Sequence, residues 1–352
     1  MVPKIKLPKR TFVAGLTAVG AMVLAATSLA VSHPIVTFKR LPSGLIQYKL
    51  PKFYGPCKKQ YTVYELQAHR ADAWAQSTAK QVNVYGKSHC LKVINEDAGG
   101  YQNVSKQLSQ LDAAIASKPA AIMLWTTDPT AVVGDVKKAL KAGIKVVNFV
   151  VPANTTADAY VAGDWRIDGG LMANAIAKKI GGKGDVLAVF GGAGGSYAAG
   201  LQAGAQKAMK AYPNIHLSVQ TIPDFDPSKV TPLVQNAITS DPNLKGVITS
   251  IAVMADGAYT AIQAAGKAGK IFTAAGLIGA KQNIQDVKTG KITVMVGVPS
   301  VFYADLGVIV TANLLNGKPF PLHTVIPGQV FTASNISIPG ALKWELRPEF
   351  LK

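Results

Sequence analysis

Residues 121–151 read AIMLWTTDPTAVVGDVKKALKAGIKVVNFVV and contain a strand–helix–strand pattern. The apolar run Ala121–Trp125 predicts a buried strand, and the Val-rich run Lys145–Val151 predicts another. Between them, Thr130–Ala142 has the spacing of a helix and ends at Gly143, a residue typical of helix C-termini. This order predicts two parallel strands with a helix packed across them.

The same alternation extends in both directions along the chain. Upstream, strands are predicted at Tyr61–Leu66 and Cys90–Ile94, and helices at 71–85 and 101–117. Downstream, the predicted strands are 159–162, 186–190, 217–221, 246–250, 272–276 and 293–298, and the predicted helices are 169–180, 198–211, 227–240, 253–265 and 299–316. The pattern predicts an α/β fold with two lobes of similar size, each with a parallel sheet covered by helices, in which a ligand lies beyond the carboxyl ends of the strands.

Length and composition exclude several classes of protein. A chain of 352 residues suits two domains, and its 49% apolar content can bury large cores, which excludes wholesale disorder. Two cysteines cannot form a four-thiolate metal site. We therefore expect neither a metal site nor a cofactor.

The first thirty residues have the pattern of a secretory signal. Basic residues from Lys4 to Arg10 precede the apolar run Phe12–Ala26, and Ser28-Leu29-Ala30 supplies small residues for a signal peptidase. We expect cleavage after Ala30, export to the periplasm and a leader over residues 31–57. The alternative is an uncleaved anchor, because Phe12 to Val31 is barely long enough to span a bilayer.

Export would place the two cysteines in an oxidising compartment. We expect a disulfide between Cys57 and Cys90, which lie near the starts of two neighbouring predicted strands. Two buried free thiols are the alternative.

The chain is strongly basic. It has 37 Lys and Arg against 19 Asp and Glu, and without the four basic residues of 1–30 the net charge is still +14. The basic residues are spread along the chain and form no arginine-rich tract or finger pattern, so we do not expect nucleic-acid binding.

Catalytic motifs are weak. Gly194-Gly195-Ser196-Tyr197-Ala198 has Ala where a nucleophile elbow has its last Gly. His216 and His323 are the candidate bases, and nothing in the sequence pairs them with Ser196. We therefore expect that the protein is not an enzyme and has no catalytic residue. A secreted serine hydrolase is the alternative.

An ordered set of short motifs resembles the ribose-binding type of periplasmic solute-binding proteins. The motifs are YVAGDWRIDGG (160–170), IGGKGDV (180–186), GGAGG (191–195), PDFD (223–226), IQDVKTGK (284–291) and LLNGK (314–318). The resemblance covers roughly residues 60–330.

The resemblance implies two Rossmann-like parallel-sheet lobes joined by three crossing segments, which close over a small ligand and present it to an ABC importer. A sensor accessory that presents its ligand to a histidine kinase is the alternative within this class. The crossings would fall near 153–158, 296–300 and 320–325. The first lobe would then comprise 58–155 and 300–319, and the second 156–297 with the tail 320–352. We also expect a monomer.

The positions where family members hold sugar hydroxyls are apolar in this chain. Leu201, Ile251 and Ile278 stand where the family has charged or amide side chains, and Val150-Val151 replaces an Asp-Arg pair. Three of the four tryptophans fall at predicted strand ends or cleft positions. We therefore expect an aromatic or apolar ligand, and poor binding of pentoses and hexoses. An ammonium ligand or the apolar face of a sugar would also suit Trp.

The candidate ligand-binding residues are Trp74, Trp125, Trp165, Phe149, Glu65, Arg70, Asp128, Leu201, Ile251 and Ile278. Asp128 has an alternative role, the cap of the following helix.

Overall fold

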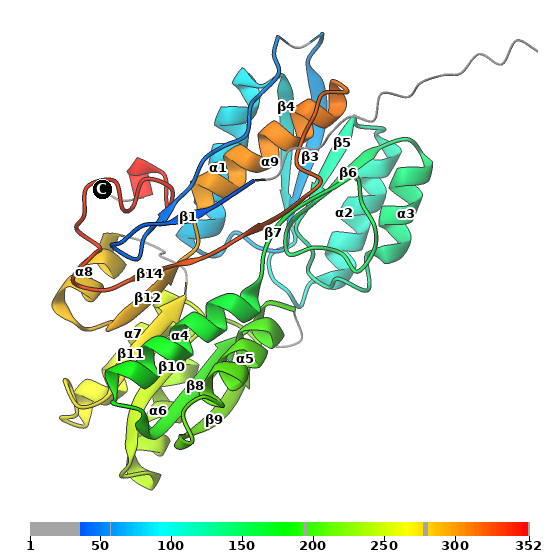
Figure 1. The fold of residues 1–352 in the computed structure, drawn as a ribbon. Coiled ribbons are helices and arrows are strands. Elements are labelled where there is room, and N and C mark those ends of the chain that lie inside the picture. The colour runs from blue at the N-terminus through cyan, green and yellow to red at the C-terminus, as the bar shows by residue number, and fades with distance from the viewer. Residues whose placement is uncertain (1–35, 57, 193–195, 277–280, 351–352) are drawn as a thin grey trace, which may run out of the picture. The chain divides into compact units, whose positions relative to one another are not determined.

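The computed structural model describes residues 36–56, 58–192, 196–276 and 281–350 (Figure 1). The chain divides into two compact units, 1–32 and 33–352, and all features below belong to the second. The predicted signal peptide lies outside the described residues and stays a prediction. No helix in the described ranges is long and apolar enough to cross a bilayer.

The first lobe is built on a six-stranded, fully parallel sheet of order β13-β7-β6-β5-β3-β4. Its strands are β3 (Tyr61–Gln67), β4 (Leu91–Asp97), β5 (Ala121–Leu124), β6 (Lys145–Val150), β7 (Ala159–Gly163) and β13 (His323–Ile326). Its helices are α1 (Ala73–Ser88), α2 (Val104–Ala116), α3 (Val133–Lys141) and α9 (Ser300–Leu315).

Alternate residues of the central strand β5 belong to two different apolar cores. Met123 packs in the core that contains Trp74 of α1 and Phe302 of α9, whereas Ile122 and Leu124 pack in the core beneath α2 and α3. The strand is therefore covered on both faces, which explains its continuous apolar sequence.

The second lobe is built on a sheet of order β14-β12-β11-β10-β8-β9, in which only β14 is antiparallel to its neighbour. Its strands are β8 (Lys183–Gly191), β9 (Asn214–Ile222), β10 (Leu244–Thr249), β11 (Phe272–Gly276), β12 (Val294–Gly297) and β14 (Gln329–Phe331). Its helices are α4 (Trp165–Lys179), α5 (Ser196–Met209), α6 (Pro227–Ser240), α7 (Ala252–Ala264) and α8 (Lys281–Thr289). The two-lobed α/β fold is the predicted one.

The strand pairing corrects the expected membership of the lobes. β7 and β13 lie beyond residue 155 and outside 300–319, yet both belong to the first sheet. The backbone of Asp158 already bonds to Val146 of β6, so the chain extends the first sheet before it leaves it. Periodicity predicts the strand at 159–162 but not its partner, and it predicts no strand at 323–326, so the expected second lobe wrongly included both segments.

The chain therefore crosses between the sheets at three places. The first crossing follows β7 near Asp164, the second joins β12 to α9 at Val298-Pro299, and the third joins β13 to β14 at Pro327-Gly328. The second lies within the expected range 296–300. The first and third come later in the chain than expected, because β7 and β13 still belong to the first lobe.

The leader packs against a crossing segment. It forms the small hairpin of β1 (Lys39–Arg40) and β2 (Ile46–Gln47). The backbone N–H of Ile46 donates to Oε1 of Gln329 over 2.8 Å, and the hydroxyl of Tyr48 donates to the carbonyl of Pro327, also over 2.8 Å. These bonds fasten the leader to the third crossing.

The C-terminal tail contains β13 and β14 and bonds to another crossing. The carbonyls of Trp344 and Glu345 accept hydrogen bonds from the start of α9, at 3.0 and 3.1 Å. The tail thus holds the second crossing.

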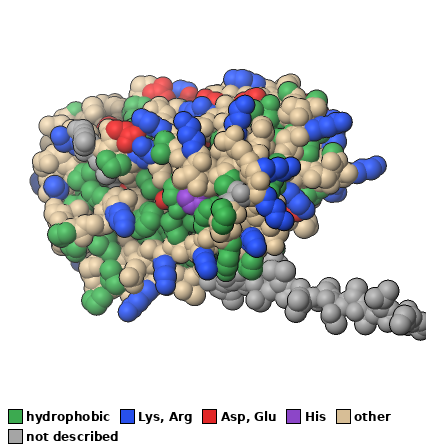
Figure 2. All heavy atoms as spheres, turned by 90° about the horizontal axis from the view of Figure 1, so that it is seen from above, with side chains coloured by type: hydrophobic (Ala, Val, Ile, Leu, Met, Phe, Trp, Pro, Cys, Tyr) green, Lys and Arg blue, Asp and Glu red, His purple; other side chains and the backbone are tan. Residues whose placement is uncertain are grey.

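Lys and Arg side chains are spread widely over the face shown in Figure 2 and do not gather into one patch. This distribution agrees with the scattered positions of the basic residues in the sequence.

Candidate ligand-binding site

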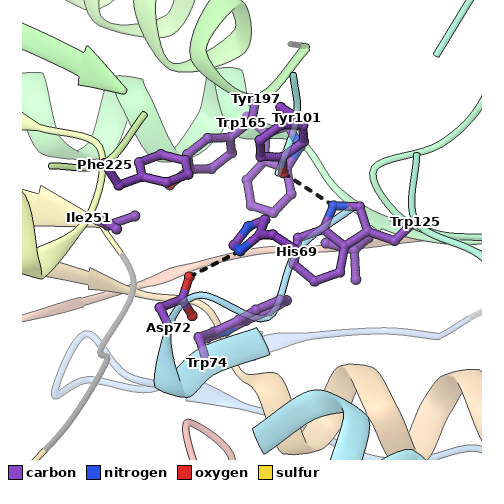
Figure 3. A pocket seen from close by; sticks show the side chains of 10 residues that line it. His69, Asp72, Trp74, Tyr101, Trp125, Trp165, Tyr197, Phe225 and Ile251 are labelled. Carbon is purple, nitrogen blue, oxygen red and sulfur yellow. Dashed lines mark hydrogen bonds and ion pairs between the residues drawn. The ribbon is translucent and has the colours of Figure 1, made fainter. Parts of the chain in front are cut away.

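A small cavity lies between the carboxyl ends of the two sheets, where open α/β folds bind their ligands (Figure 3). Its volume is about 20 Å³, which is room for about one water molecule. Residues of the first lobe that line it are His69, Asp72, Trp74, Tyr101, Trp125 and Val150, and those of the second lobe are Trp165, Tyr197, Phe225 and Ile251. We call this set the aromatic box.

The rings of the box meet edge to face. Trp74 and Trp125 lie 5.6 Å apart at 89°, and Trp165 and Tyr197 lie 5.0 Å apart at 80°. The His69 ring lies among them, 4.9 Å from Trp125, and also contacts Phe225 of the other lobe at 5.8 Å (Figure 3). Such arrangements stabilise aromatic pairs beyond simple burial.

Most polar atoms of these rings are already bonded within the protein. Trp74 Nε1 donates to the carbonyl of Val298 over 2.6 Å, and Trp125 Nε1 donates to the hydroxyl of Tyr101 over 3.2 Å. The Tyr197 hydroxyl donates to the carbonyl of Ser250 over 2.9 Å. The rings therefore offer mainly apolar faces and edges to a ligand, and few groups that could bind hydroxyls.

Trp165 Nε1 is an exception, because it is buried and has no hydrogen-bond partner among the described residues. A buried donor without a partner is costly, so this indole is the ring donor most available to a ligand.

Asp72 supplies the carboxylate of the box, and His69 supplies its imidazole. Asp72 Oδ1 accepts the Ala75 N–H over 2.9 Å and so caps α1, while Oδ2 lies 3.7 Å from His69 Nδ1. Burial lowers the pKa of His69, against the opposing effect of the Asp72 and Asp97 carboxylates. The imidazole is therefore neutral at pH 7.

The structure brings four of the ten predicted residues into the box, namely Trp74, Trp125, Trp165 and Ile251. Phe149 and Leu201 are buried elsewhere: Phe149 packs against Tyr303, and the carbonyl of Leu201 abuts Gly169 of α4. Ile278 lies outside the described residues.

Asp128 has the structural role that was its alternative. Its Oδ1 accepts the N–H groups of Thr130 and Ala131, at 2.7 and 3.0 Å, and so caps the turn that leads into α3.

Glu65 and Arg70 belong to a buried network rather than to the box. Glu65 Oε2 accepts from Asn95 Nδ2 over 2.8 Å, and Arg70 Nε donates to Gln67 Oε1 over 2.7 Å. The Arg70 guanidinium is 4.0 Å from Glu65 Oε2. Burial raises the pKa of Glu65 to about 7.

Besides the His69 imidazole, three rings of the box were not among the ten predicted residues: Tyr101, Tyr197 and Phe225. All three follow a strand, since Tyr101 comes after β4, Tyr197 after β8 and Phe225 after β9. Position after a strand, which marks the tryptophans in the sequence, therefore marks these three rings as well.

The described residues show no arrangement typical of a catalytic or metal site. Ser196 Oγ is buried without a hydrogen-bond partner in the described structure, so no base activates it. In the described ranges, no group of three or more His, Cys, Asp or Glu side chains could hold a metal ion. Cys57 lies outside the described residues, and its disulfide with Cys90 stays a prediction.

Comparison with known proteins gives the family. The periplasmic binding protein domain matches residues 66–319. The chain belongs to this family. It is 30% identical to the ribose import binding protein of Salmonella typhimurium over 61% of this chain and 72% of the relative. It is 24% identical to the xylitol-binding protein of Mycolicibacterium smegmatis, over 73% of each chain.

The fold is also that of solved solute-binding proteins. A solute-binding protein of Agrobacterium vitis, solved with α-D-tagatopyranose, superposes with a TM-score of 0.74 at 23% identity, over 82% of this chain and all of the other. The periplasmic binding protein is thus of the ribose-binding type, a substrate-binding component of ABC importers and not an enzyme.

Proposed function

We propose that this protein binds a small ligand with an apolar or aromatic surface in the aromatic box and presents it to an ABC importer. Export to the periplasm by the predicted signal peptide is part of this proposal. The observation that carries it is the bonding of the ring polar atoms: those of Trp74, Trp125 and Tyr197 are bonded to protein atoms. A monosaccharide needs side chains that bind its hydroxyls, and the box supplies few.

The cavity has little free space in this conformation, so a ligand needs the lobes to move apart at the crossings. Hinge closure around a ligand is the usual motion of such two-lobed proteins. Closure would then bring Trp165, Tyr197 and Phe225 of the second lobe onto the ligand.

A thermal-shift screen of the chain from Val31 onward tests this proposal. The panel holds sugars, polyols, aromatic acids, indoles and amines. A ligand at a hundred times its dissociation constant adds about 2.7 kcal/mol of stability. We expect stabilisation by compounds with apolar or aromatic surface. Stabilisation by a plain pentose or hexose alone would contradict the proposal.

Trp165→Ala identifies the site of any compound found. We expect at least tenfold weaker binding, because the ring and its Nε1 donor are both lost. Phe272→Ala is the matched control, since Phe272 starts β11 at the end of the second sheet opposite the cavity. Equal affinity of the Trp165 variant and the wild type would remove Trp165 from the site.

A further inference from the structure

The cleft differs in charge from the rest of the molecule. Lys and Arg outnumber Asp and Glu about two to one in the chain. A groove that shares Trp165 with the aromatic box contains Arg166, whose guanidinium forms an ion pair with Asp164 at 3.0 Å. The described residues that line the box itself and the two grooves that share Asp72 with it include no Lys or Arg. Their carboxylates are Asp72, Asp224 and Asp256.

Two of these carboxylates are neutralised nearby. Asp224 forms an ion pair with Lys229, and Asp256 with Lys291 at 2.7 Å. Asp72 differs, because in the described structure no Lys or Arg forms an ion pair with it. One of its oxygens caps α1 and the other lies 3.7 Å from the neutral imidazole of His69. Asp72 therefore places an uncompensated negative charge on the wall of the box.

The remaining walls are suited to positive charge. The face of an aromatic ring is electron-rich and attracts cations, and Trp does so most strongly. The box holds three Trp rings together with Tyr101, Tyr197 and Phe225. Burial lowers the pKa of His69 and keeps it neutral, and the cation–π contacts of the described residues involve no ring of the box.

We propose that the ligand is an organic cation, a quaternary or protonated alkylammonium, held against the ring faces of the box with Asp72 as its counter-charge. This inference rests on the proposed function and names its ligand class. The relatives named above bind sugars or polyols by their titles, so the inference distinguishes this chain from them.

Calorimetric titration with two isosteric probes tests the charge directly. The probes are choline and 3,3-dimethylbutan-1-ol, which share shape and hydroxyl but differ in the positive charge. We expect choline to bind at least tenfold more tightly, from cation–π attraction and the Asp72 charge. Equal affinities, or no binding of choline, would overturn the inference.

The same titrations separate this inference from the proposed function. If indoles or the neutral alcohol bind and choline has no advantage, the apolar site stands and the cation does not. If only plain sugars bind, both proposals fail.

Asp72→Asn isolates the counter-charge. Asn caps helices as well as Asp does, so the start of α1 is preserved while the charge is removed. We expect choline affinity to fall about tenfold and the affinity of the alcohol to stay unchanged. Asp128→Asn, which alters a cap in the same lobe outside the box, is the control and should change neither. Unchanged choline affinity in Asp72→Asn would show that Asp72 is not the counter-charge.

Discussion

Two buried carboxyl groups lie beside glycines of the crossing segments. Asp168 of α4 accepts the backbone N–H of Gly328, and a Cβ on Gly328 would lie 2.5 Å from its Oδ1. Glu345 of the tail accepts from Gln329 Nε2 over 2.7 Å, and a Cβ on Gly297 would lie 2.6 Å from its Oε2. No Lys, Arg or His forms an ion pair with either acid in the described part of the chain.

Because these two acids are buried, we expect the free energy of unfolding to fall as the pH rises. Burial raises the pKa of Asp168 to about 7 and that of Glu345 to about 8, from 3.8 and 4.5. At these two sites the folded state binds protons more tightly than the unfolded state, so their contribution to stability is complete below about pH 4 and is lost as the pH rises to about 8. We expect urea unfolding to show a loss of at least about 2 kcal/mol between pH 5 and pH 8, at about 1.4 kcal/mol per pKa unit.

Replacing each acid by its neutral amide tests whether that acid causes the loss of stability at high pH. Asp168→Asn and Glu345→Gln should each flatten the pH profile, and only in part, because burial also raises the pKa values of Glu65 and Asp305. Profiles as steep as that of the wild type in both variants would show that these carboxyls are not the source.

At the scale of elements, the wall of the box depends on a close approach of α4 and α5. A Cβ on Gly204 would lie 1.9 Å from the carbonyl oxygen of Arg166, and one on Gly169 would lie 2.1 Å from that of Leu201. Only glycine lets the two backbones come this near. The approach holds Trp165, at the start of α4, against Tyr197 of α5.

Gly204→Ala should therefore force the two helices apart. We expect a loss of about 1–3 kcal/mol in the free energy of unfolding, as for other overpacked sites. Gly134→Ala is the matched control, because a Cβ there meets nothing within 4 Å. Alanine favours helix by up to about 1 kcal/mol over glycine, so the control should be neutral or stabilising. Chemical denaturation measures both, and an equally stable Gly204 variant would contradict the close approach.

Elements with a strong period could be predicted, and their partners could not. Pro227–Ser240 and Phe272–Gly276 have the bounds that the sequence predicts. The helix Lys281–Thr289 and the short strands β13 and β14 were not predicted, since they carry little periodic apolar sequence. The partner of β7 depends on tertiary pairing, which no local pattern reports.

The residues of the site also divide into those that the sequence pattern predicts and those that it does not. Tryptophans after strands were found because ligands of open sheets lie there. Glu65 also lies near a strand end, but strand alternation turns it towards the α1 side, where Asn95 bonds it. Tyr101 and Phe225 lie in or beside loops, where no period marks their side chains.

For the molecule as a whole, direct ring contacts join the two lobes. Phe225 of the second lobe contacts His69 at 5.8 Å and Tyr101 at 6.4 Å in the first. Contacts between aromatic rings are attractive, so they favour a closed arrangement of the lobes.

Phe225→Ala should shift the lobes towards an open arrangement. We expect a larger radius of gyration by small-angle scattering than for the wild type, with little change in thermal stability. Phe272→Ala, at the far end of the second sheet, should leave the radius unchanged. An unchanged radius in the Phe225 variant would mean that other contacts hold the lobes together.

The positions of the tryptophans make intrinsic fluorescence a probe of the cleft. Three of the chain's four tryptophans line one cavity, and the fourth, Trp344, packs against Phe302 beside the second crossing. All four tryptophan side chains therefore lie at the cleft or beside a segment that joins the lobes. Intrinsic fluorescence thus reports on the moving parts of this molecule without any attached dye.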